Sequence, residues 1–83
     1  MFELKIISPD EMFFEGEAKF FEFTSTEGER GVYKNHIPTT LILKECVMRI
    51  HQADEVKKVK VSGGFVEILQ EKITVLAETA EWV

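Results

Sequence analysis

Short runs in which apolar and polar residues alternate recur along the whole chain, and they constrain its fold more than any other feature. In FELKIIS, Leu4 and Ile6 flank Lys5, and the same alternation returns in VKKVKVS. This pattern is typical of a strand with one buried face. No window of a dozen residues keeps apolar positions at the spacing of an amphipathic helix. Further strand-like runs are AKFFEFTS, TTLILKE, VMRIHQ, FVEILQ and KITVLAET.

Turn-forming residues separate these runs. They are Ser8-Pro9-Asp10, Gly16, Glu27-Gly28, Lys34-Asn35, Ala53-Asp54-Glu55, Ser62-Gly63-Gly64 and Gln70-Glu71-Lys72. We expect the Gly63-Gly64 pair to form a bulge, or a bend where the chain crosses between sheets. Close-set strands without helices predict an antiparallel sandwich or barrel, and 83 residues suffice for one domain.

Composition excludes several functional classes. Fifteen acidic residues outnumber ten basic ones, for a formal net charge of −5, which disfavours nucleic acid binding. The single cysteine, Cys46, rules out an intramolecular disulfide framework. No apolar run approaches the roughly 20 residues that span a bilayer, and the first residues do not resemble a secretory signal. We therefore expect a soluble cytoplasmic protein, or a soluble part of something larger.

No catalytic or metal pattern stands out. His36 and His51 are far apart in the sequence, and no spacing with Cys46 resembles a zinc site. Cys46 begins an expected strand, where cysteine usually serves as a small hydrophobe, and Ser62 lacks a nucleophile-elbow pattern. We therefore expect no enzyme activity, no metal and no cofactor.

The stretch TEGERGVYKNHIP, residues 26–38, is the most unusual segment. We expect a polar loop in which Gly28 and Gly31 adopt positive φ angles. Tyr33 and His36 could bind a small ligand there, so the residues alone leave open a stand-alone ligand-binding β-domain. Physical reasoning alone gives a small all-β domain whose role stays undecided.

The same stretch carries a family resemblance. EGERGVYKNHIP resembles the E-G-E-x-G-I-x-P-x-H-A-P segment of the epsilon subunit of F-type ATP synthases. Upstream, ISPDEMFFEGEAKFFEF is similar to the family's opening, and VKVSGGFVEILQEKITVLAETAE resembles its closing motifs, so the resemblance covers essentially all 83 residues. Lys34-Asn35, Ile37 and Glu45-Cys46 depart from the family pattern, at positions that affect local turns.

The resemblance implies a flattened antiparallel β-sandwich of two packed sheets, as a single domain over residues 1–83. It implies a non-catalytic rotor subunit that docks on the gamma subunit and on the c-ring, and helps couple proton or sodium flow to ATP synthesis. The expected location is the cytoplasmic face of the plasma membrane, as a peripheral component. Many family members add a C-terminal helical hairpin, whose inhibitory or ATP-sensing roles are not carried over here.

The resemblance also assigns contact residues. The candidates for the c-ring are Glu29, Arg30, Gly31 and His36, with Tyr33 as a supporting neighbour, and those for the gamma subunit are Ser8 and Leu41. The alternative remains a stand-alone small-ligand-binding domain that uses the Tyr33/His36 loop.

Overall fold

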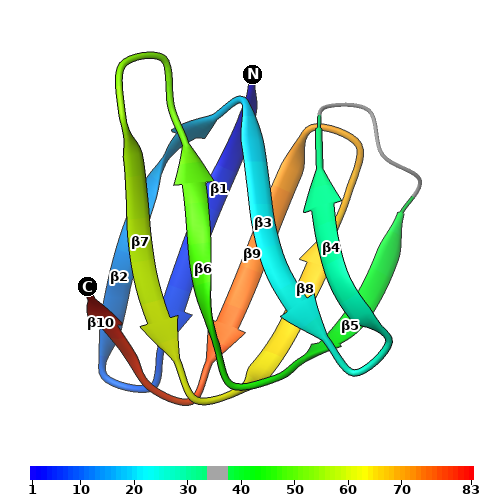
Figure 1. The fold of residues 1–83 in the computed structure, drawn as a ribbon, viewed down its shortest axis with the longest axis vertical. Helices are drawn as coiled ribbons and strands as arrows, with labels where there is room; N and C mark the ends of the chain where they lie inside the picture. The colour runs from blue at the N-terminus through cyan, green and yellow to red at the C-terminus, as the bar shows by residue number, and fades with distance from the viewer. Residues whose placement is uncertain (34–37) are drawn as a thin grey trace.

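The computed structural model describes residues 1–33 and 38–83, and the regular structure of these residues consists of strands (Figure 1). The strands are β1 (Phe2–Ser8), β2 (Glu11–Ala18), β3 (Phe20–Ser25), β4 (Gly28–Val32), β5 (Thr39–Leu43), β6 (Cys46–His51), β7 (Val56–Val61), β8 (Gly64–Ile68), β9 (Lys72–Ala77) and β10 (Ala80–Trp82). The all-β prediction is confirmed.

The strands form two layers that face each other (Figure 1). One layer runs β10-β7-β6-β3 with β4 beside β3, and the other runs β5-β8-β9-β1-β2. The layers join where the end of β3 meets β5 at Ser25 and Leu43, so the hydrogen-bonded ladder is continuous and resembles a barrel. Pairing is antiparallel except between β1 and β9, which run parallel from Glu3 opposite Lys72 to Ile7 opposite Leu76. The sandwich prediction is confirmed, and the parallel pair is a feature that it did not include.

Aromatic rings bring the two ends of this ladder together. Trp82 of β10 packs against Phe13 and Phe14 of β2, with ring centroids 4.8 and 5.9 Å apart. The Lys57 ammonium lies 5.4 Å from the centroid of the Phe14 ring and 5.8 Å from that of Trp82. Side-chain packing between β10 and β2, in place of backbone hydrogen bonds, therefore closes the barrel.

The core fills the space between the layers with alternate residues of each strand. Fully buried side chains include Leu4 and Ile6 of β1, Phe21 of β3, and Met48 and Ile50 of β6. Burial of each such side chain contributes roughly 1.5–3 kcal/mol. The alternation in the sequence thus assigned the inner face of these strands correctly.

The Gly63-Gly64 pair lies where the chain crosses from β7 in one layer to β8 in the other, as predicted. Gly64 has φ +138°, and a Cβ built there would stand 1.9 Å from the carbonyl oxygen of Leu76 on β9. Only glycine allows the backbones of β8 and β9 to approach this closely.

Candidate functional site

The residues expected in a polar loop form a strand instead. Gly28–Val32 is β4, which pairs with β3 from Phe21 opposite Val32 to Ser25 opposite Gly28. The loop prediction is therefore wrong for Glu29, Arg30 and Gly31. The sequence concealed this strand because β4 lies off the main ladder and buries only Val32, so its composition is that of a turn.

A turn of two residues, Thr26 and Glu27, joins β3 to β4, and side-chain hydrogen bonds and an ion pair stabilise it. The hydroxyl of the buried Ser25 donates a hydrogen bond to the Gly28 carbonyl at 3.0 Å and accepts one from the Glu27 N–H at 3.1 Å. Arg30 Nη2 lies 2.8 Å from Glu27 Oε1. Gly28 has φ +117°, as predicted. The turn thus holds the exposed side chains of Glu27 and Arg30 in a defined position.

Gly31 serves a different purpose from the one predicted. Its φ is not positive; it lies inside β4, where a Cβ would stand 2.6 Å from Cζ of Phe20. The missing side chain makes room for the Phe20 ring, which stacks on Tyr33 with centroids 4.3 Å apart and lies 5.1 Å from the His51 ring. Tyr33 is 66% exposed. These rings form an aromatic row from Tyr33, which directly follows β4, across β3 to β6.

The structure spreads the candidate c-ring residues along the sandwich. Glu29 and Arg30 lie near the β3–β4 turn, whereas Tyr33 follows the other end of β4. At about 3.3 Å per strand residue, Arg30 and Tyr33 are roughly 10 Å apart along the chain. His36 lies outside the described residues. The described candidates therefore occupy an edge strand, not one compact loop.

The candidate gamma contacts lie in the other layer. Ser8 ends β1, where its hydroxyl donates to the Glu11 carbonyl at 3.4 Å, and it borders a shallow hollow of about 290 Å³. Leu41 of β5 is half-buried and packs against the core. Its neighbour Ile42 points outward instead and is 53% exposed.

Ile42 begins a row of apolar side chains that sequence reasoning missed. Cross-strand pairs connect Ile42 to Phe65, Phe65 to Leu76, Leu76 to Ile7 and Ile7 to Met12. We call these five residues the apolar row. Phe65 is 53% exposed, Leu76 50% and Met12 46%, while Ile7 is half-buried. The signal was present in the sequence as apolar residues at the outward position of a strand, such as Leu76 between the buried Val75 and Ala77.

The next row of side chains on this outer face is polar. Thr40, Glu67, Thr74, Lys5 and Glu15 occupy the next row of cross-strand pairs. Lys5 Nζ lies 3.6 Å from Glu3 Oε1 and 3.8 Å from Glu15 Oε2. The apolar row is therefore a bounded stripe near the turns at Pro9-Asp10 and Gly63.

Two other classes of site are absent from residues 1–33 and 38–83. These residues include no helix that is long and apolar enough to cross a membrane. They also include no group of three or more His, Cys, Asp or Glu side chains that could hold a metal ion.

Comparison with known proteins gives the same family along the whole chain. Residues 1–83 match the family model described as ATP synthase, Delta/Epsilon chain, beta-sandwich domain. The ATP synthase epsilon chain of Pelotomaculum thermopropionicum is 42% identical over 78 residues, which are 94% of this chain and 58% of that relative. The epsilon chain of Caldanaerobacter subterraneus is 35% identical over 82 residues, which are 98% and 59% of the two chains. This chain thus spans about three-fifths of the length of the curated relatives it matches.

Solved structures share the fold. A chain in the mitochondrial ATP synthase of Euglena gracilis superposes with a TM-score of 0.91 at 20% identity, over 98% of this chain and 52% of that one. A chain in the central stalk and c-ring structure of the Tetrahymena thermophila mitochondrial ATP synthase gives a TM-score of 0.80 at 15% identity, over 96% and 65%. With the family match and the epsilon-chain relatives, the chain belongs to the family of the ATP synthase delta/epsilon chain β-sandwich domain.

Proposed function

We propose that this chain acts as a non-catalytic central-stalk subunit of an F-type ATP synthase. It docks on the gamma subunit and on the c-ring, and so supports assembly and the coupling of ion translocation to ATP synthesis. The complex places it at the cytoplasmic face of the plasma membrane, as a peripheral component. The observation that carries this proposal is the apolar row, because a contiguous exposed apolar stripe is typical of a protein-binding surface.

The gamma subunit is the proposed occupant of the apolar row. Ser8 borders the row through the hollow that it shares with Ile7, Phe65 and Leu76. Leu41 packs inward from the same strand that presents Ile42. Covering the exposed half of Phe65, on the order of 100 Å², contributes about 2.5 kcal/mol before the costs of association.

The c-ring contact is proposed at the β3–β4 hairpin. Glu29 and Arg30 are exposed charged residues on a strand that a buried hydroxyl and an ion pair hold in place. Rigidly presented polar groups suit the recognition of short polar loops. Gly31 supports the hairpin indirectly through Phe20, and Tyr33 adds a contact near the opposite end of β4. His36 is kept as a further candidate from the family resemblance alone.

The stand-alone ligand-binding alternative needs Tyr33 in a concave apolar pocket. Tyr33 is instead 66% exposed and stacks on Phe20. No specific observation favours this alternative, so we do not propose it.

Co-purification with the gamma subunit of the same ATP synthase tests the gamma contact. We expect a stoichiometric complex in size-exclusion chromatography. Phe65→Gln should weaken it at least tenfold, since it removes the largest side chain of the row. Leu69→Gln is the matched control, because Leu69 is 43% exposed but lies outside the row. If the chain elutes alone well above micromolar concentration, or both variants bind equally, gamma docking through the apolar row is wrong.

Cross-linking in the reconstituted complex tests the ring contact separately. Cys46 is first replaced by Ser, and a single cysteine is introduced as Glu29→Cys or, on the opposite layer, as Glu67→Cys. We expect cross-links to c subunits from position 29 and not from position 67. Equal yields from both positions, or none from position 29, would contradict the assignment.

A further inference from the structure

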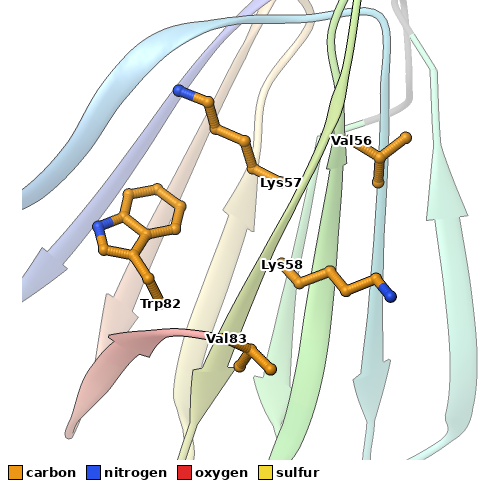
Figure 2. Close-up of a pocket in the computed structure, with 5 residues that line it drawn as sticks. All are labelled: Val56, Lys57, Lys58, Trp82 and Val83. Atoms are coloured by element: carbon orange, nitrogen blue, oxygen red, sulfur yellow. The ribbon is translucent and has the colours of Figure 1, made fainter.

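A cluster of cations lies on the outer face of β6 and β7, in the layer opposite the apolar row. Arg49 stands directly opposite Lys58, and Lys60 lies two residues further along β7. We call these three exposed side chains the basic patch. Val47 and Val56, which are 42% and 48% exposed, lie on the same face. Figure 2 shows Lys57 directed toward Trp82 and Lys58 leaving β7 in another direction.

The basic patch forms no ion pair with the part of the chain that the structure describes. Lys5, Arg30 and Lys57 each lie near a glutamate, but among residues 1–33 and 38–83 no ion pair joins any cation of the patch to an acid. Two carboxylates flank the patch. Glu22, opposite Arg49, bonds to His51 Nε2 at 2.7 Å instead, and Glu81 stands opposite Lys60.

This arrangement is unfavourable for the isolated chain. Like charges directly opposite on neighbouring strands destabilise a sheet, and Arg49 and Lys58 are such a pair. The chain carries fifteen acidic residues, enough to have paired every cation. Uncompensated positive charge on an acidic protein therefore indicates a negatively charged partner at this face.

We propose that the basic patch is a docking surface for an acidic segment of a partner polypeptide. Its carboxylates face Arg49, Lys58 and Lys60, which present their charges on one face of β6 and β7. Residues two apart on a strand are separated by about 6.7 Å, and cross-strand Cβ atoms by about 5 Å. Carboxylates on alternate residues of an extended segment match the first of these spacings.

A groove beside the basic patch provides a site for one side chain of such a segment. β3 pairs with β6 only from Phe20 opposite His51 to Glu22 opposite Arg49, and the ladder then moves to β5. A hollow of about 440 Å³ opens where this pairing stops, with Val47 and Arg49 on one side and Thr24, Glu29 and Arg30 on the other. Glu29 and Arg30 are also candidates for the c-ring contact, so the two proposed sites meet at this hollow. The surface lies in the opposite layer from the apolar row, so both can be occupied together, and the inference does not depend on gamma docking.

The surroundings favour a polypeptide over an extended anionic surface. Glu22, Glu29 and Glu81 surround the three cations on the same layer, and the whole chain has a net charge of −5. A bilayer or a nucleic acid would place its negative charges close to these carboxylates as well, and the carboxylates would repel them. A short acidic segment contacts the basic patch alone.

Fluorescence anisotropy with a labelled peptide of alternating Glu and Val tests the proposal on the 83-residue chain. We expect binding at low salt that weakens as ionic strength rises, and none for the same peptide with Gln in place of Glu. The double variant R49Q/K58Q should lower the affinity roughly tenfold, because it removes two charge-assisted contacts. The double variant K5Q/K72Q is the matched control, with the same change in charge on the opposite layer, and should stay within about twofold.

A stability measurement separates recognition from folding. Removing the opposed Arg49 and Lys58 charges should leave the urea midpoint of R49Q/K58Q unchanged or higher, while peptide binding falls. Equal losses of binding in the two double variants overturn the proposal. So does preferential binding of phosphatidylserine vesicles or tripolyphosphate at the patch, which would assign it to a lipid surface or to a free phosphate.

Discussion

Gly64→Ala tests whether the close approach of β8 and β9 sets the stability of this fold. The new Cβ would stand 1.9 Å from the Leu76 carbonyl oxygen, and real Cβ atoms keep at least 3.0 Å. The backbones must therefore separate by about 1.1 Å (3.0 − 1.9), at a point where β8 and β9 are hydrogen-bonded. A flexible side chain could move away at little cost, but here the obstacle is backbone.

Two contributions add at this position. A non-glycine residue at φ +138° costs of order 1–3 kcal/mol, and overpacking typically costs a further 1–3 kcal/mol. We expect Gly64→Ala to lower the free energy of unfolding by about 2–6 kcal/mol. An 83-residue domain has about 4–12 kcal/mol in total, so the variant should be partly unfolded at 37 °C or close to it.

Gly28→Ala is the matched control for backbone conformation. Gly28 also has a positive φ, +117°, but a Cβ there meets nothing within 4 Å. We expect a loss of only about 1–2 kcal/mol, from conformation alone. Urea unfolding followed by Trp82 fluorescence measures both variants. Equal losses would refute the reasoning, since they would leave no contribution from the Leu76 contact.

Three further predictions concern single contacts, and urea unfolding measures each. Gly31→Ala should cost about 0.5–1.5 kcal/mol by displacing the Phe20 ring, and this cost should disappear in a Phe20→Leu background. Ser25→Ala should cost about 1–3 kcal/mol, because the turn loses the hydroxyl that bonds two backbone groups. Lys57→Met should cost about 0.5–1 kcal/mol, since it keeps the aliphatic stem but removes the charge over Trp82.

Each of these has an outcome that contradicts it. An unchanged cost of Gly31→Ala in the Phe20→Leu background means that the ring is not the obstacle. If Ser25→Thr, which keeps the hydroxyl, is as damaging as Ser25→Ala, the lost bonds are not the cause. If Lys57→Gln and Lys57→Met are both neutral, the cation over the rings contributes nothing to stability.

Alternation predicted the inner face of most strands because burial on one side of a sheet imposes a period of two. Leu4, Ile6, Val59 and Val61 are all buried, as their positions in the pattern require. The pattern carries no information on strand direction, so the parallel pairing of β1 with β9 could not be derived from it. That pairing depends on contacts between residues some seventy positions apart.

The predictions for the site were weaker because edge strands escape the alternation rule. β4 has one buried residue and two glycines, so its sequence resembles a turn although it pairs along its whole length. Gly31 was misassigned for a related reason: the ring that requires it, Phe20, lies on the neighbouring strand. The apolar row was missed because a single apolar residue at an outward position is unremarkable, and only the cross-strand register brings five of them together.

The two surfaces differ in chemistry, and the thin sandwich keeps them apart. The molecule measures 27 × 27 × 20 Å along its principal axes, and the apolar row and the basic patch lie on its two opposite outer faces. An apolar contact gains little from charge, whereas the basic patch attracts a partner at distances up to about a Debye length, roughly 8 Å at physiological salt. Raising the ionic strength should therefore weaken binding at the basic patch and leave gamma docking through the apolar row nearly unchanged. A domain arranged in this way presents two chemically distinct surfaces that two partners can occupy at once.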